Sequence, residues 1–382
     1  REIWRDWLES REKKIVRIEN VGFDPTEQDA QVTCNLWGGW PTTPREGECT
    51  ELLALLEYIC SYEANSKGIY EWLLKWLAYP IVNPGAKMRT ALVVHGPQQV
   101  GKNYFFETVM GIYGEYGQVI NQDAIEDKYN DCFSKKLYLI ADEVVARQEM
   151  RHVKNKLKGM ITGNSIRINP KNVKSYWEKN HCNIIFLSNE IQPLMLERDD
   201  ARHVVLWTPP RLSADFYAKV KAEVEAGGQE ALHWHLKNNI DLTGFDRFTP
   251  PPMTEAKRDL MDLGMDSTER FYLQWSDGKL DPVPFLPARS RQLHRFYREW
   301  CSASGYRSSA PEPQFVAEIT RRFGAKKKTS RITKGGTQLQ ARFILPTSIE
   351  QPLDKTESQW LTHCVDEFTA GVSAWRDDEE RS

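Results

Sequence analysis

The sequence predicts an α/β fold in which a parallel sheet is flanked by helices. Four apolar runs of strand length support this prediction: "ALVVH" at 91–95, "LYLIAD" at 137–142, "NIIFLS" at 183–188 and "HVVLW" at 203–207. Each run is apolar at successive positions, so both of its faces are expected to be buried. Helical or loop segments separate the runs, and strands connected in this way form parallel sheets.

The composition is that of an ordinary globular protein. It is 40% hydrophobic and 27% charged. Its length of 382 residues is enough for two or three domains. The chain has no run of about 18 apolar residues, so no membrane partner is expected. Its seven cysteines form no Cys-x-x-Cys pair, which favours a reducing, cytoplasmic location over a disulfide framework or a zinc site. Because the chain starts without Met, we expect its first residue to be either an artificial boundary or a cut inside a longer protein.

Composition shifts and proline-rich stretches divide the chain into five expected parts. The segment "TELLALLEYICSYEANSKGIYEWLLKWLAYP" repeats apolar residues at helical spacing and predicts two packed helices that end at Pro80. The expected parts are a mostly helical region 1–85, a core with a phosphate loop 86–212, a helical lid and linker 213–282, a basic module 283–348 and a polar tail 349–382.

The stretch after the first apolar run has the glycine–lysine spacing of a phosphate-binding loop. Glycines allow backbone N–H groups to face phosphate oxygens, and the start of the following helix adds a positive dipole end. Lys102 is expected to reach the β- and γ-phosphates of ATP; the alternative is an ordinary glycine turn between a strand and a helix. The predicted nucleotide-binding residues are Gly96, Pro97, Gln98, Gln99, Val100, Gly101, Lys102 and Asn103.

Mg²⁺ is expected beside this loop. Asn103 replaces the usual hydroxyl residue, but an amide oxygen is also a hard donor that can bind Mg²⁺ or one of its waters. The second apolar run ends in Asp142 and Glu143, and adjacent carboxylates can divide metal binding from activation of water. Asn103 and Asp142 are therefore the predicted metal residues and Glu143 the predicted base. Solvated acids at a strand end are the alternative.

Three more side chains are candidates for contact with the γ-phosphate. Asn189 ends the third apolar run and could sense the phosphate or orient water; a strand-capping turn is the alternative. Arg198 and Arg202 precede the fourth run, and either could act on a neighbouring subunit's nucleotide as an arginine finger. The alternative for each arginine is a surface pair with a neighbouring aspartate.

In this order, "GPQQVGKN", "LYLIADE", "SIRINPKNVKSYW", "NIIFLSNE" and "ERDDARHVVLWTPP" resemble the superfamily 3 helicases, which are AAA+-like P-loop ATPases. The likeness is to the helicase part of phage and mobile-element primase–helicases and spans about residues 34–346. It implies ATP and Mg²⁺ as cofactors, single-stranded and forked DNA as partners, a hexamer, a bacterial host cytoplasm if the protein is phage-encoded, and a possible primase domain or partner. In the family a hairpin lysine contacts single-stranded DNA, and Lys171, then Lys174, match it best.

The sequence departs from this family at two places. Asn103 replaces the hydroxyl residue of the loop. Ala201 and Arg202 stand where the family often has two arginines, so one role is missing or has passed to Arg198.

The segment from Arg289 to Arg342 carries 13 basic and three acidic residues, although the whole chain has a net charge of −2. Such a concentration of positive charge is typical of binding to a phosphate backbone. Two amphipathic helices followed by a basic hairpin match the plan of a winged helix. The candidate DNA-binding residues in this module are Arg321, Lys326, Lys327, Lys328 and Arg331.

These features favour an ATP-dependent DNA helicase that moves on single-stranded DNA as a ring during phage or mobile-element replication. The alternative is an ATP-regulated replication initiator or loader that binds DNA without processive unwinding. An ATPase that acts on protein is a third hypothesis, but it leaves the hairpin lysines unexplained.

Overall fold

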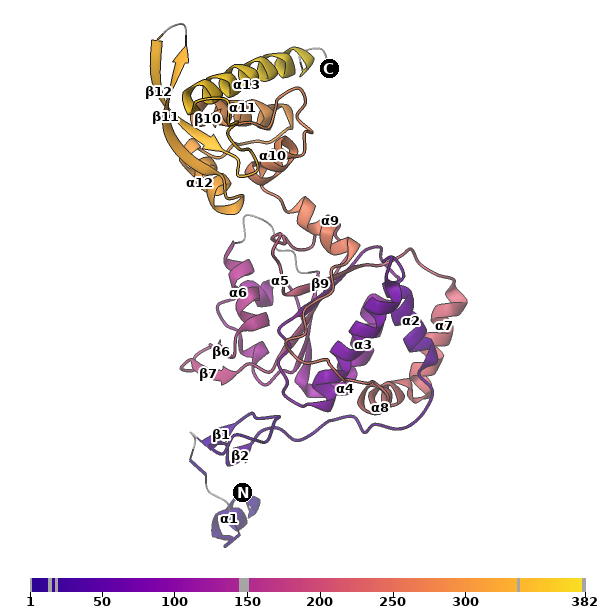
Figure 1. Ribbon diagram of the computed structural model, residues 1–382. Coiled ribbons are helices and arrows are strands. Elements are labelled where there is room, and N and C mark those ends of the chain that lie inside the picture. Colours follow the sequence, from indigo (N-terminus) through magenta and orange to yellow (C-terminus); the bar gives the residue numbers. More distant parts are fainter. Residues whose placement is uncertain (1, 13–15, 18–19, 144–150, 335–336, 380–382) are drawn as a thin grey trace. The chain divides into compact units, whose positions relative to one another are not determined.

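The computed structural model describes residues 2–12, 16–17, 20–143, 151–334 and 337–379 (Figure 1). The chain forms two compact units, Arg1–Gly264 and Met265–Ser382. No helix among the described residues is long and apolar enough to cross a membrane.

The first unit is built on a five-stranded sheet in which every neighbouring pair is parallel. Its strands, in spatial order, are β4 (Gly117–Ile120), β5 (Tyr138–Asp142), β8 (Asn183–Ser188), β3 (Ala91–His95) and β9 (His203–Trp207). The four predicted apolar runs are four of these strands. The prediction of a parallel sheet flanked by helices is therefore confirmed. The sequence pattern did not indicate β4, a short edge strand in which Val119 is 41% exposed.

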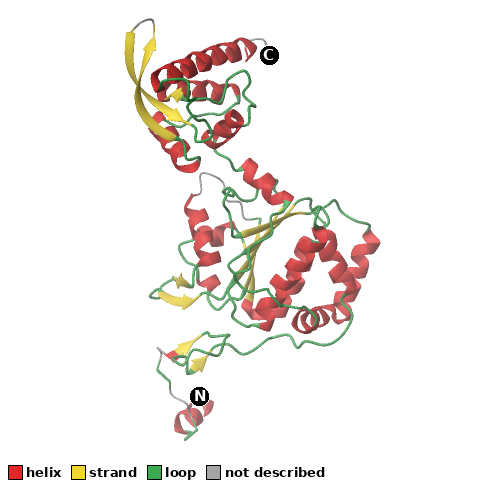
Figure 2. Cartoon of the chain, in the orientation of Figure 1, coloured by secondary structure: helices red, strands yellow, loops and turns green. Residues whose placement is uncertain are grey.

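Alternate side chains of the four apolar strands, β3, β5, β8 and β9, enter two different cores. In β3, Leu92 and Val94 pack into one core, while Val93 packs into the other. Figure 2 shows helices on both sides of the sheet, as this alternation requires. The first core includes α2 (Thr50–Cys60), α3 (Ser66–Val82), α4 (Lys102–Tyr113), α7 (Ala214–Glu223) and α8 (Gln229–Asn238). The second core includes α5 (Gln122–Glu126), α6 (Arg151–Thr162) and α9 (Glu255–Leu263).

The two N-terminal helices that the sequence predicts are confirmed as α2 and α3. Their apolar faces belong to the core over the sheet, so they are part of the first unit. Pro80 lies inside the last turn of α3, which continues to Val82. The remaining short elements of this unit are α1 (Glu2–Glu9), β1 (Val21–Gly22), β2 (Cys34–Asn35), η2 (Gly114–Tyr116), η3 (Asp131–Phe133), β6 (Ser165–Ile168), β7 (Tyr176–Lys179) and η4 (Val224–Gly228).

The second unit combines helices with a small antiparallel sheet. Trp300 and Phe315 are buried in its aromatic core. Its strands pair in the order β10-β12-β11. The elements are α10 (Ser267–Ser276), β10 (Ala288–Arg289), α11 (Ser290–Ala303), α12 (Glu312–Arg322), β11 (Lys326–Lys334), β12 (Thr337–Leu345) and α13 (Glu357–Glu379).

Two of the expected part boundaries need correction. Residues 349–382 were expected to form a polar tail, but most of them form α13. Its apolar residues Trp360, Leu361 and Phe368 recur at helical spacing and are buried against the second unit. The boundary between units also falls after Gly264, so α10 is part of the second unit and not of a lid or linker. Phe271 and Trp275 of α10 are core residues there.

Candidate nucleotide site

The predicted phosphate loop joins β3 to α4 at the carboxyl edge of the sheet. Three of its residues have positive φ angles: Gly96 (134°), Gln99 (61°) and Gly101 (88°). A Cβ atom on Gly96 would lie 2.5 Å from Oγ1 of Thr208, so this position admits only glycine. Gly101 is the N-cap of α4, and positive φ angles at a helix start allow backbone N–H groups to face an anion.

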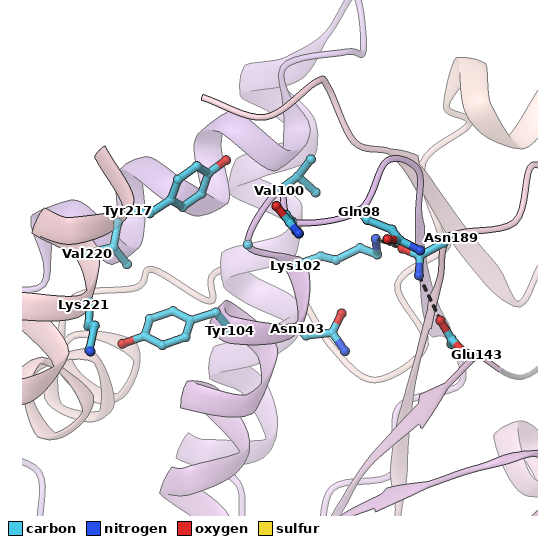
Figure 3. Close-up of a pocket in the computed structure, with 12 residues that line it drawn as sticks. Gln98, Val100, Lys102, Asn103, Tyr104, Glu143, Asn189, Tyr217, Val220 and Lys221 are labelled. Atoms are coloured by element: carbon cyan, nitrogen blue, oxygen red, sulfur yellow. Dashed lines mark hydrogen bonds between the residues drawn. The ribbon is translucent and has the colours of Figure 1, made fainter. Parts of the chain in front are cut away.

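Lys102 points back across this loop (Figure 3). Its Nζ donates to the carbonyl oxygens of Gly96 (3.2 Å) and Pro97 (3.0 Å) and to Oδ1 of Asn189 (2.5 Å). Only 4% of the residue is exposed. Burial lowers the pKa of Lys102, and the nearby carboxylates of Asp142 and Glu143 oppose that shift. A buried ammonium group therefore lies at the base of the loop.

Asn189 connects this ammonium group to the acidic strand. Its Nδ2 donates to Oε1 of Glu143 at 2.9 Å, the bond drawn as a dashed line in Figure 3. The connection follows from strand order, because β8 lies between β3 and β5 and all three end at the same edge. Glu143 itself has a φ of 52°, an uncommon backbone conformation for a non-glycine residue and one found often at functional sites.

Asn103 and Asp142 are also brought together. Nδ2 of Asn103 donates to Oδ1 of Asp142 at 3.1 Å. This bond uses the amide nitrogen, which leaves Oδ1 of Asn103 as the atom that can coordinate a cation. Among the residues that the structure describes, no group of three or more His, Cys, Asp or Glu side chains is placed to hold a metal ion. The oxygen donors here are thus one carboxylate and one amide.

A cavity of about 620 Å³ opens beside these side chains. Most of the predicted loop residues line it, together with Glu143 and Asn189, whereas Pro97 contributes only its carbonyl contact to Lys102. The lining residues are Gln98, Gln99, Val100, Gly101, Lys102, Asn103, Tyr104, Glu143, Asn189, Tyr217, Val220 and Lys221.

The side of the cavity away from Glu143 was not predicted from the sequence. Tyr104 from α4 and Tyr217, Val220 and Lys221 from α7 form it (Figure 3). Arg211 was also missed: its Nη1 donates to Oε1 of Gln99 at 2.8 Å, and its guanidinium lies over the ring of Tyr217. No local motif marks these residues, because only the tertiary fold brings α7 to the loop.

The two candidate arginines lie away from this cavity. Arg202 immediately precedes β9, whose first residue pairs with Ala91 at the start of β3. It is therefore at the amino edge of the sheet, whereas the phosphate loop leaves the carboxyl edge. Neither Arg198 nor Arg202 lines the cavity of its own chain.

Asp200 is one of the two aspartates in the alternative interpretation, a surface pair of an arginine with Asp199 or Asp200, and its carboxylate contacts other groups. Its carboxylate accepts bonds from the backbone and ring of His203 and pairs with the buried Lys257 at 3.3 Å. Burial alone would raise the pKa of Asp200, but the hydrogen bonds from His203 and the charge of Lys257 hold it well below its ordinary value. Asp200 therefore fixes the turn that precedes β9.

The predicted hairpin between the acidic strand and Asn189 is confirmed as β6 and β7, which pair antiparallel. Lys171 and Lys174 lie exposed in its connecting loop. None of the hairpin residues lines the cavity.

The five candidate DNA-binding residues of the second unit are exposed, but they do not share one face. Arg321 lies in the last turn of α12, and the other four alternate along β11. Lys328 faces α13, where it pairs with Glu357, whereas Lys327 and Arg331 have the opposite orientation in the strand. The α13 helix also adds six acidic residues and one Arg to the unit. The turn of the predicted basic hairpin is expected at Gly335–Gly336, which lie outside the described residues.

The fold and this site define a class: a parallel α/β protein in which a glycine loop and a buried lysine meet an acidic strand end. A family model described as a family of unknown function (DUF5906) matches residues 94–203, from the end of β3 to the start of β9. The DNA primase-polymerase of Nitratiruptor phage NrS-1 is 33% identical over 155 residues, which are 40% of this chain and 21% of that protein. The chain thus matches about a fifth of the length of this relative.

Solved structures of the NrS-1 C-terminal region share the fold. One apo structure has a TM-score of 0.63 at 20% identity and covers 82% of this chain and 80% of that one. A second apo form has a TM-score of 0.62 at 19% identity and covers 85% and 84%.

Proposed function

We propose that the chain is the ATP-driven motor of a phage or mobile-element replication protein, a DNA helicase of the superfamily 3 type. The observation that carries this proposal is the hydrogen-bonded chain from Lys102 through Asn189 to Glu143. It links a phosphate-loop lysine, a polar strand end and a carboxylate across three neighbouring strands, as nucleotide hydrolysis requires. The similarity to a phage protein named a DNA primase-polymerase supports the replication context.

The residues present fit ATP with Mg²⁺. The loop admits only glycine at Gly96 and presents backbone N–H groups, while Lys102 supplies a buried positive charge. A bound Mg²⁺ would neutralise charge on the β- and γ-phosphate oxygens. It typically binds few protein ligands and keeps several waters, so Oδ1 of Asn103 and the Asp142 carboxylate are a sufficient donor set.

The other groups then have distinct roles. Glu143 accepts the proton of the attacking water, and Asn189 holds that carboxylate in place and contacts the γ-phosphate. Preorganised groups of this kind stabilise the charge that develops in the transition state. Neither Arg198 nor Arg202 lines the cavity of its own chain. We therefore propose that one of them serves the nucleotide of a neighbouring subunit in a ring, which by analogy with the superfamily 3 helicases is a hexamer.

DNA contact is assigned to two regions. Lys171 and Lys174 are exposed on the hairpin loop, and we propose that they contact a single-stranded backbone without reading its sequence. In the second unit α10, β10, α11, α12 and the β11–β12 hairpin follow one another in this order. We propose that the unit is a winged helix and that its exposed cations contact duplex DNA at a fork.

A replication initiator or loader is the second candidate. Two features favour it: the basic hairpin of the second unit, and the Ala201–Arg202 pair, which has one arginine where the family often has two. In such a protein, ATP would control assembly on DNA without driving processive unwinding.

The ATPase site is tested by Lys102→Ala, with Lys219→Ala as a matched control. Lys219 is an exposed lysine on α7 that does not line the cavity. We expect Lys102→Ala to reduce DNA-stimulated ATP hydrolysis by a factor on the order of 100 or more, because the buried charge opposite the phosphates is lost. Unchanged turnover in Lys102→Ala would refute the site.

A further inference from the structure

The β6–β7 hairpin has two chemically different faces. Residues that pair directly across an antiparallel ladder lie on the same side. Ile166 and Ile168 pair with Glu178 and Tyr176, and this face turns inward: Ile168 is fully buried, and Ile166 packs on the second core. The opposite face consists of Ser165, Arg167, Trp177 and Lys179, all of which are exposed.

The inward face is firmly anchored. Oδ1 of Asn130 accepts a hydrogen bond from the backbone N–H of Asn169 (2.6 Å), and its Nδ2 donates to the carbonyl of Arg167 (2.8 Å). The carboxylate of Glu178 accepts bonds from the Ser134 hydroxyl and the Lys135 backbone. The orientation of the hairpin is thus fixed by bonds that leave its outer face uncovered.

Trp177 is conspicuous on this outer face. It is 68% exposed, and an indole of this size normally loses most of its surface to packing. Arg167 lies directly opposite it in the ladder, and Lys179 lies two residues further along the same strand, about 7 Å away. The guanidinium of Arg167 donates to the Ser175 hydroxyl, whereas Lys179 pairs with Asp29 at 2.6 Å.

We propose that Trp177 is a base-stacking platform for single-stranded nucleic acid, with Arg167 beside it to neutralise the backbone. This rests on the proposed function, in which Lys171 and Lys174 at the loop contact the same strand. An exposed aromatic face among cations is complementary to an unstacked base joined to phosphates. The bases of a duplex are already stacked on each other, so the platform is selective for single strands.

The test measures binding of a fluorescent oligo-dT to the whole chain by anisotropy, without ATP, for wild type, Trp177→Ala and Trp177→Phe. Phe248→Ala is the matched control, because Phe248 is a 57% exposed aromatic elsewhere in the same unit. We expect Trp177→Ala to weaken binding by about 5- to 150-fold and Trp177→Phe to restore most of it. Phe248→Ala should bind as wild type does.

Two further readouts separate stacking from charge. The salt dependence of binding should be unchanged in Trp177→Ala, whereas Arg167→Ala should reduce the slope by about 0.7. A strand of the same length with abasic sites should bind wild type and Trp177→Ala equally.

The remaining outcomes overturn the inference in distinguishable ways. If Trp177→Ala binds oligo-dT normally while Lys171→Ala does not, stacking is refuted and the proposed function stands. If Trp177→Ala binds normally but changes the mass of the assembly, the face is a subunit contact. If wild type does not bind single strands, both the inference and the proposed DNA role fail.

Discussion

Nζ of Lys102 lies 2.5 Å from Oδ1 of Asn189, and the amide nitrogen of the same Asn189 side chain lies 2.9 Å from Glu143. One amide therefore bridges a buried cation and the proposed base. Its two ends have opposite hydrogen-bonding character, so the acceptor faces the ammonium group and the donor faces the carboxylate. Asn is well suited to both contacts, whereas Asp would present a second carboxylate to Glu143.

Replacement of Asn189 tests this bridge. Asn189→Ala should lower kcat for ATP hydrolysis by a factor on the order of 100, because Glu143 loses its orienting donor. Nucleotide affinity should change by only a few-fold, since the loop and Lys102 remain. Steady-state kinetics and binding of a non-hydrolysable ATP analogue separate the two effects. A variant with normal kcat would show that the bridge has no role in hydrolysis.

Asn103 can be tested through the metal requirement. Asn103→Ala removes the amide oxygen that we assign to Mg²⁺, so the Mg²⁺ concentration for half-maximal ATPase activity should rise by roughly tenfold. Asn103→Ser restores an oxygen donor of the common type and should return the requirement close to that of wild type. An Asn103→Ala enzyme with an unchanged Mg²⁺ titration would exclude Asn103 from the metal shell.

The placement of Arg202 predicts complementation between subunits. β9 has five residues, which puts Arg202 about 16 Å from the carboxyl edge where the loop lies. Arg202→Ala and Lys102→Ala should each be inactive alone, and a mixture should regain part of the ATPase activity, because some interfaces then combine an intact loop with an intact arginine. The same mixture with Arg198→Ala identifies which arginine acts. The absence of recovery for both arginines would argue against a finger in trans.

The sequence was sufficient for the parts of the fold that rest on continuous local patterns. Each of the four buried strands, the loop and the hairpin corresponds to one continuous run of residues in the sequence. The edge strand β4 was missed because only four residues form it and one face is open. The α13 helix was missed because its exposed acids mask a regular apolar stripe. Tyr217 of α7 and Arg211, which precedes α7, join the site only through tertiary packing against the loop, which no local spacing encodes. Tyr104 follows Asn103 directly on α4, but no motif marks it.

The most direct test of the account is ATP-dependent unwinding of a forked DNA duplex by wild type and Glu143→Gln. Glu190→Gln is the matched control, because Glu190 is an exposed carboxylate at the end of the neighbouring strand and does not line the cavity. We predict that wild type and Glu190→Gln separate the strands only with ATP and Mg²⁺, and that Glu143→Gln is slower by a factor on the order of 100 while it still binds nucleotide and DNA. Unwinding by Glu143→Gln at the wild-type rate, or ATP-dependent DNA binding by wild type without unwinding, would contradict the helicase assignment.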